Sequence, residues 1–140
     1  GTAWLADAPD TVFPYSGKVM RPNAAIDQAA SVLRVRDALF ERLGIHFDAC
    51  LLNHYPDGGT HMRYHSDPDQ GVLWTNHSAV VSFGEVRLFA FRGIQDPSQR
   101  HQFYVRGGDA VHMYGMCQED YQHAILKAGG AAEATGSRVS

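Results

Sequence analysis

Hydrophobic residues recur along the chain with two different periods, and the change comes near residue 45. In "PNAAIDQAASVLRVRDALFERLG" (residues 22–44) the apolar side chains share one helical stripe, which comprises Ile26, Ala30, Leu33, Phe40 and Leu43. Asn23 suits the capping position before a first helical turn, and Gly44 suits the position just after the last turn. The pattern therefore predicts one helix over this segment.

From residue 45 onward, apolar positions alternate with polar ones. In "IHFDACLLNHY" (residues 45–55) the odd positions share one face, which turns polar at its far end with Asn53 and Tyr55. Further strands are expected at 78–83, 86–92, 101–106, 109–115 and 121–126, and a short strand pair around "FPYSG" (residues 13–17). Short strands separated by Gly- and Asp-containing turns indicate a mainly β (α+β) protein, a jelly roll or double-stranded β-helix with the N-terminal helix packed outside it.

Composition places the chain among ordinary globular proteins. Its 140 residues fit one domain, spanning residues 1–140. Hydrophobic residues make up 44% and charged residues 19%, which argues against disorder. The formal net charge of -3 argues against a protein that holds nucleic acid by overall charge, although a local basic face remains compatible with it.

The two cysteines and the lack of long apolar runs indicate in which cellular compartment the protein is expected. Cys50 and Cys117 lie in apolar, strand-like segments and are expected to be buried thiols, which favours a reducing compartment. No apolar run approaches the length of a membrane span, and "GTAWLADAPD" (residues 1–10) lacks the pattern of a signal peptide. We expect a nuclear or cytoplasmic protein that is neither secreted nor bound to a membrane.

Candidate chemistry centres on "HMRYHSDPD" (residues 61–69). If this segment lies on or just after a strand, His65 and Asp67 project to the same side, because alternation sends Ser66 the other way. His123, in the strand expected at 121–126, is the candidate for a third ligand. Two imidazoles and one carboxylate on one face of a metal suit non-haem Fe(II) oxygenases.

The His-x-Asp pattern is a weak signal by itself, because the chain contains it twice. "HFD" supplies His46 and Asp48, and His101 lies at a similar distance downstream. This second set directly follows the expected helix and occupies the strand face opposite Asn53 and Tyr55, so we interpret it as outward-facing surface. The choice between the two sets depends on the surrounding motifs.

Those motifs are "LLNHYPDGGTHMRYHSD", "VVSFG", "RLFAFR", "GGDAVHMYG", "YQHAI" and "RVS", in this order. Together they resemble the AlkB family of Fe(II)- and 2-oxoglutarate-dependent dioxygenases over residues 13–140. The resemblance implies Fe(II), 2-oxoglutarate and O2 as cofactor and cosubstrates. It also implies roles for six residues: iron ligation by His65, Asp67 and His123, and 2-oxoglutarate binding by Asn53, Tyr55 and Arg138.

The chain departs from the family pattern at its end. The family continues as Arg-x-Asn-x-x-x-Arg, whereas Ser140 stands at the Asn position and the sequence stops there. Either the C-terminal strand is cut short or the cosubstrate site is weakened. We expect truncation, because a strand that ends at its second residue leaves a sheet edge uncovered.

The resemblance further implies oxidative removal of alkyl groups from bases of DNA or RNA, in DNA repair or RNA demethylation, with release of formaldehyde, succinate and CO2. It makes Tyr15 a candidate for stacking on a flipped base and Asp69 a candidate acceptor for a base amino group; Trp4 is a candidate for a further wall. Taken alone, Tyr15 is equally a packed strand aromatic, Asp69 a turn residue after Pro68, and Trp4 an ordinary hydrophobic residue. We expect a monomer that acts on alkylated nucleic acid.

Two alternatives remain open at this point. The same fold could carry a hydroxylase or demethylase of a protein or a small molecule. The absent second arginine also leaves room for a catalytically weak, metal-binding jelly-roll module.

Overall fold

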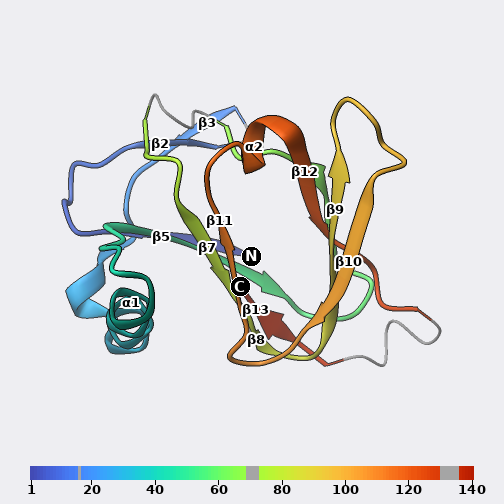
Figure 1. Ribbon diagram of the computed structural model, residues 1–140. Coiled ribbons are helices and arrows are strands. Elements are labelled where there is room, and N and C mark those ends of the chain that lie inside the picture. Colours follow the sequence, from blue (N-terminus) through green and yellow to red (C-terminus); the bar gives the residue numbers. More distant parts are fainter. Residues whose placement is uncertain (16, 69–72, 130–135) are drawn as a thin grey trace. The chain divides into compact units, whose positions relative to one another are not determined.

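The structure is a computed structural model that describes residues 1–15, 17–68, 73–129 and 136–140. The chain divides into two compact units, Gly1–Asn53 and His54–Ser140. Figure 1 labels the helices and strands of both units.

The first unit joins a small sheet to the one long helix. Strand β1 (Thr2–Ala6) pairs in parallel with β4 (Ala24–Ala25) and antiparallel with β5 (Ala49–Tyr55). A hairpin of β2 (Phe13–Tyr15) and β3 (Lys18–Met20) confirms the strand pair expected at residues 13–17, and Gly17 takes a positive φ of 75° in its turn. Strand β1 itself was not expected from the sequence.

The helix begins later than its apolar stripe predicts. Helix α1 spans Ala30–Leu43 and is preceded by a 3₁₀ turn, η1 (Ile26–Gln28), so the prediction of Asn23 as its cap is wrong. The side-chain oxygen of Asn23 instead accepts a hydrogen bond from the backbone N–H of Trp4 at 2.8 Å, and the Asn23 backbone N–H donates to the Trp4 carbonyl at 2.7 Å. These two bonds keep residues 23–25 beside β1. The predicted end is confirmed, since Gly44 is left-handed with a φ of 68°.

The second unit contains a four-stranded antiparallel sheet in the order β10-β9-β12-β6. Its strands are β6 (Met62–His65), β9 (Arg87–Gly93), β10 (Arg100–Val105) and β12 (Tyr121–Ile125). Strand β7 (Ser78–Val81) pairs with β11 (Ala110–Met113), while β13 (Arg138–Val139) lies between the end of β5 and β8 (Phe83–Gly84). Figure 1 shows β9, β10 and β12 on one side of this unit and β7 and β11 on the other.

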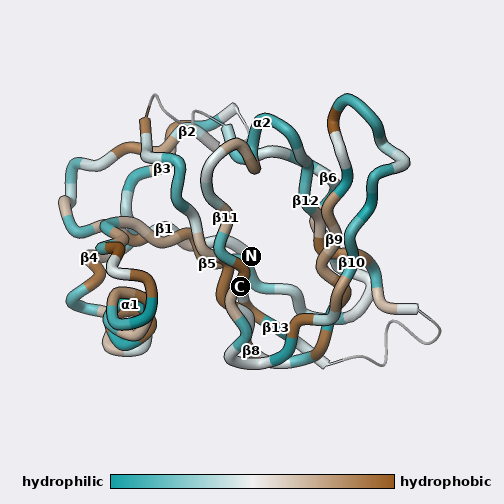
Figure 2. Tube along the Cα trace, viewed as in Figure 1, coloured by the Kyte–Doolittle hydropathy of each residue, from teal (hydrophilic) through white to brown (hydrophobic). Residues whose placement is uncertain are grey.

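The core of the second unit lies between these strands. It consists of Tyr55, Phe89, Val105 and Ile125, with Met62, Val80, Phe91 and Val111 packed against it. Burial of each large apolar side chain contributes roughly 1.5–3 kcal/mol. Figure 2 shows that the part of β9 nearest this core is brown, whereas α2 (Cys117–Asp120) and the far end of the β9–β10 hairpin are mostly teal. The period-two strands thus pack as expected, and the mainly β fold with few helices is confirmed.

Two expectations need correction, and a third is mostly untested. Strand β5 begins at Ala49 instead of Ile45, so His46 and Asp48 precede the strand. The segment 117–120 forms the one-turn helix α2, and Cys117 therefore lies on a helix and not on a strand; both cysteines are free, and burial raises the pKa of each thiol. The loop expected at residues 127–137 falls largely outside the described residues.

Candidate metal centre

Two of the three predicted iron ligands face each other across neighbouring strands. His65 is the last residue of β6, and His123 is the middle residue of β12; they are direct cross-strand partners in an antiparallel pair. Side chains of such partners project to the same face of a sheet. The two imidazole rings accordingly lie with centroids 4.3 Å apart and planes at 54°.

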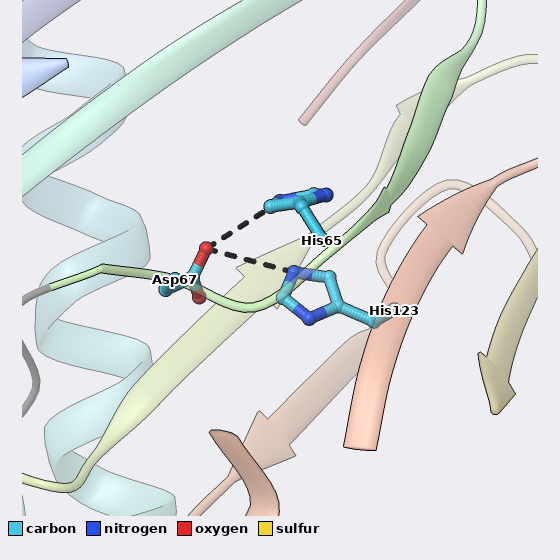
Figure 3. Close-up of side chains that lie close together, drawn as sticks. All are labelled: His65, Asp67 and His123. Atoms are coloured by element: carbon cyan, nitrogen blue, oxygen red, sulfur yellow. Dashed lines mark ion pairs between the residues drawn. The ribbon is translucent and has the colours of Figure 1, made fainter. Parts of the chain in front are cut away.

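The carboxylate enters from the loop just after β6. Oδ1 of Asp67 lies 3.5 Å from Nε2 of His65 and 3.6 Å from Nε2 of His123, and Figure 3 shows the carboxylate facing both rings. One potential ligand atom from each residue lies within 4.8 Å of the others. Ligand atoms about 2.1 Å from one metal and at right angles around it lie roughly 3 Å apart. The spacing therefore fits a single divalent cation after a small contraction.

Electrostatics separate the two imidazoles. Burial lowers the pKa of His123 to about 4, although the charge of Asp67 acts in the opposite direction. The hydrogen bond with Asp67 raises the pKa of His65. Burial acts to raise the pKa of Asp67, but the hydrogen bond with His65 and the electrostatic interactions with the two histidines outweigh it, so the net pKa is lowered. The cluster therefore holds an ionised carboxylate beside a neutral, buried imidazole, which are the protonation states that a metal requires.

The ring of His65 is fixed by a second contact. Its Nδ1 lies 2.8 Å from the carbonyl oxygen of Arg63. Because a carbonyl can only accept, the Nδ1 proton is held by Arg63, and Nε2 is the ring atom left to bind a metal in place of its proton. This backbone contact sets the tautomer that metal-binding histidines use.

Aromatic rings line the side of the cluster next to β9. The ring of Phe89 stacks on His123 at 5.9 Å and 6°, and Phe91 lies 6.2 Å from the same imidazole. Phe89 is buried. This apolar wall keeps water away from one side of the metal position and lowers the local dielectric constant.

Gln118, which the sequence did not mark as functional, contacts the carboxylate directly. Its Nε2 donates to Oδ2 of Asp67 at 2.9 Å, and its Oε1 accepts from the backbone N–H of Asp67 at 2.8 Å. The hydroxyl of Ser66 donates to the Tyr121 carbonyl at 3.1 Å. Each of the three consecutive residues His65, Ser66 and Asp67 is thus held by at least one hydrogen bond. A polar residue in the short segment "MCQED" gives no sequence signal for this role.

Arg138, which the resemblance made a candidate for 2-oxoglutarate binding, has a buried guanidinium. Arg138 is 1% exposed and lies opposite Tyr55 in the β13–β5 pair, with its guanidinium carbon 5.2 Å from the centroid of the Tyr55 ring. Nη2 donates to the hydroxyl of Ser82 at 2.7 Å, whereas Nε and Nη1 have no hydrogen-bond partner within the described ranges. Burial lowers the pKa of this guanidinium. Buried donors without acceptors are costly, and a carboxylate oxygen is the acceptor that binds a guanidinium N–H most strongly.

Ser82 and Arg87 are two further residues that the sequence left without a role. Ser82 is buried and orients Arg138 through the bond just described. Arg87 is also buried, and its guanidinium donates to the carbonyls of Asp57, Thr60 and Leu126. Its contacts hold the loop between β5 and β6, so its role is structural.

The remaining predicted site residues have varied positions. Asn53 ends the first unit on β5, opposite Thr2 of β1 and two residues before Tyr55. Trp4 is 6% exposed on β1 and stacks on Phe13 with centroids 4.7 Å apart, so it offers a base only a narrow edge. Asp69 and the side chain of Tyr15 lie outside the described part of the chain.

The alternative set of ligands does not assemble in the described residues. Nε2 of His46 lies 3.1 Å from Oδ2 of Asp7, on the exposed surface of the first unit. His101 is an exposed residue of β10 in the second unit. Among the residues that the structure describes, the group of His65, Asp67 and His123 is the one set of three or more metal-binding side chains close enough to share an ion.

Strands around two imidazoles, one carboxylate and a buried arginine define a non-haem Fe(II) oxygenase. The chain belongs to the 2OG-Fe(II) oxygenase superfamily, whose family model matches residues 3–140. Fe(II), 2-oxoglutarate and O2 are accordingly its cofactor and cosubstrates, and the His-Asp-His cluster offers the donor set that Fe(II) takes.

Individual relatives place it among the AlkB-like members. It is 34% identical over 139 residues to an uncharacterized protein of Acanthamoeba polyphaga mimivirus, covering 99% of this chain and 69% of that protein. It is also 34% identical over 80 residues to the DNA oxidative demethylase ALKBH2 of Mus musculus, over 57% of this chain and 32% of the demethylase. The chain thus spans about a third of that enzyme's length.

A solved structure confirms the fold. The structure of OsALKBH1 superposes with a TM-score of 0.62 at 15% identity, covering 99% of this chain and 75% of that chain. The predicted jelly-roll fold of an AlkB-like oxygenase is therefore confirmed. Among the described residues, neither helix has the length and apolar character that a bilayer crossing requires.

Proposed function

We propose that this chain catalyses Fe(II)- and 2-oxoglutarate-dependent oxidative dealkylation of alkylated bases in DNA or RNA. The observation that carries the proposal is the convergence of His65, Asp67 and His123, whose potential ligand atoms lie within 4.8 Å of one another. In this proposal these three side chains hold the iron. They leave the remaining positions of an octahedral ion open for the cosubstrates.

Arg138 and Tyr55 would hold 2-oxoglutarate, together with Asn53. The N–H groups of Nε and Nη1 of the buried Arg138 lack partners and can donate charge-assisted hydrogen bonds to carboxylate oxygens of 2-oxoglutarate. Ser82 holds the third nitrogen and so leaves those two donors free. Phenol and amide groups such as those of Tyr55 and Asn53 can hydrogen-bond the remaining oxygens of the cosubstrate.

Bound iron, with O2 and 2-oxoglutarate, supplies the oxidising power that inserts one oxygen atom into a C–H bond of an N-methyl group. The other oxygen atom ends in succinate as 2-oxoglutarate loses CO2. The N-hydroxymethyl product then releases formaldehyde and leaves the base with an N–H. The chain's own contribution is to orient the cosubstrate through Arg138 and to exclude water with Phe89 and Phe91.

Two observations support a nucleic-acid substrate. One is the similarity to enzymes described as DNA oxidative demethylases in Mus musculus and Bos taurus. The other is a group of three basic side chains in the second unit, Arg63, Arg92 and Lys127, which help to line a cavity of about 480 Å³ whose lining does not include the three metal-binding residues. Such a cluster can contact phosphates locally even though the whole chain is acidic. Tyr15, Asp69 and Trp4 remain the proposed contacts to the base.

The test combines two products. The chain with Fe(II) and 2-oxoglutarate is incubated with DNA and RNA oligonucleotides that carry single N-methylated bases, and succinate and formaldehyde are both measured. Formaldehyde that depends on the methylated base, in step with succinate, supports the proposal. Succinate without formaldehyde from any oligonucleotide favours a hydroxylase of a protein or small molecule. Metal binding without succinate leaves a metal-binding module.

A further inference from the structure

The side-chain amide of Gln118 makes a reciprocal contact with Asp67. One end donates to Oδ2 at 2.9 Å, and the other end accepts from the backbone N–H of the same residue at 2.8 Å. The two residues are 51 positions apart in the chain, so the contact joins α2 to the loop after β6. Gln118 is 8% exposed, and its Nε2 also lies 3.7 Å from the sulfur of Met113.

With this contact, the two carboxylate oxygens of Asp67 face different partners. Oδ1 faces Nε2 of both histidines, at 3.5 and 3.6 Å, and Oδ2 faces the amide of Gln118. A side-chain amide can donate at one end and accept at the other, which few other side chains can do. Methionine or leucine at this position would leave both groups of Asp67 without this partner.

We propose that Gln118 is a positioning residue of the metal centre. Its amide hydrogen-bonds Oδ2 and the backbone N–H of Asp67, so that Oδ1 alone is available to bind the metal. The inference rests on the proposed function, because it takes His65, Asp67 and His123 as the ligands. A carboxylate free to turn can bind a cation through both oxygens. That second bond would occupy a position that the oxygenase needs for 2-oxoglutarate or O2.

A purely structural role for Gln118 makes a different prediction. The loop has another anchor, the bond from the Ser66 hydroxyl to the Tyr121 carbonyl at 3.1 Å, which does not touch the carboxylate. If Gln118 only fastens the loop, its removal lowers the melting temperature in the same way as Ser66→Ala and leaves the metal spectrum alone. If it positions Oδ1, the metal spectrum changes as well.

The experiment compares Gln118→Met with wild type and with Gln102→Met, which alters an exposed glutamine of β10. Mn(II) affinity is measured by titration, and the visible d–d absorbance of the Co(II)-loaded chain reports the number of ligands. We expect Gln118→Met to weaken Mn(II) binding about 10- to 100-fold, the range typical of outer-shell partners of metal ligands. The Co(II) spectrum of Gln118→Met is expected to shift. Gln102→Met is expected to match wild type in both Mn(II) affinity and Co(II) spectrum.

A second variant covers the case in which Gln118→Met fails to fold. Gln118→Asn keeps the amide but is one methylene shorter, so it cannot reach both atoms of Asp67 at once, and the same two changes are expected. Wild-type Mn(II) affinity and an unshifted Co(II) spectrum in a folded variant would overturn the positioning role. Failure of the wild-type chain itself to bind Mn(II) would instead overturn the proposed function, so the two failures are distinguishable.

Discussion

The chain contains the pattern His-x-Asp twice, and the two copies have different surroundings. His46 lies before β5, with its side chain 55% exposed, and its carboxylate partner is Asp7 instead of the Asp two positions on. His65 ends a strand beside a second imidazole, and its partner is the Asp two positions on. The comparison shows that the His-x-Asp spacing alone does not form a metal site. A third ligand on a neighbouring strand and a fixed carboxylate are also required.

The strongest way to break this comparison is to remove one imidazole from each copy. We expect His65→Ala and His123→Ala to lower Mn(II) affinity by more than about 100-fold, beyond the range of outer-shell changes, and to abolish succinate formation. His46→Ala is expected to leave both unchanged, because His46 is bonded to Asp7 at the surface of the other unit. Titration with Mn(II) and a succinate assay measure the two effects.

The matched histidine variants also protect against a trivial explanation. All three substitutions remove one imidazole, so a general effect of lost histidine would appear in each of them. Equal losses in His46→Ala and His65→Ala would contradict the assignment of the ligands. Normal succinate output from His65→Ala would do so even more directly.

The second prediction concerns the buried guanidinium of Arg138 in the second unit. Charge-assisted hydrogen bonds contribute roughly 1.5–3 kcal/mol each, so the loss of even one such bond in Arg138→Met should weaken 2-oxoglutarate binding at least roughly 10-fold. Mn(II) affinity should stay near that of wild type, because Arg138 does not touch the metal cluster in the interactions described. Calorimetric titration with 2-oxoglutarate in the presence of Mn(II) measures the change.

Arg100→Met is the matched control for this substitution. Arg100 is exposed on β10, and its Nε donates to the Pro97 carbonyl at 3.1 Å. Arg100→Met removes the same charge from the same unit as Arg138→Met does, and 2-oxoglutarate binding is expected to be unchanged. If Arg138→Met binds 2-oxoglutarate as wild type does, the cosubstrate lies elsewhere.

Period-two alternation was sufficient to predict most of the second unit. It placed strands close to β7, β9, β10, β11 and β12, each of which contributes at least one side chain to the core or its margin. It failed where a side chain serves a distant partner. Asn23 has the composition of a helix cap, yet its amide oxygen binds the backbone of Trp4, 19 residues away. Local propensity carries no information about such a contact.

Alternation supplied the candidate ligands of the site, whereas the choice between the two His-x-Asp sets came from the surrounding motifs. The spacing of His65 and Asp67 and the strand around His123 are visible in the sequence, and these three groups do lie together. Gln118 was not predictable, because its importance comes from a contact across 51 residues. Ser82 has likewise no local signal, since its partner Arg138 lies 56 residues further on. Residues that support a site from outside are found by structure.

The melting temperature provides a further test of the comparison between the two His-x-Asp copies, because a metal that binds the folded chain raises its stability. A metal that binds only the folded chain, at 100 times its dissociation constant, adds about 2.7 kcal/mol to the free energy of unfolding. For a domain of this size that corresponds to a rise in Tm of at least about 5 °C. We expect Mn(II) to produce this rise in wild type and in His46→Ala, and to produce none in His123→Ala. A rise in all three would show that Mn(II) binds outside the cluster.

The smallest expected effect comes from the exposed copy of the pattern. His46→Asn removes the contact between Nε2 and Asp7, but Asp7 keeps its ion pair with Arg36 at 2.9 Å. Exposed ion pairs contribute between about 0 and 1 kcal/mol, so the free energy of unfolding should fall by less than about 1 kcal/mol. Urea denaturation without metal measures this change. A loss of several kcal/mol would mean that the first copy is a structural centre in its own right, and the contrast between a solvated pair and a built site would then fail.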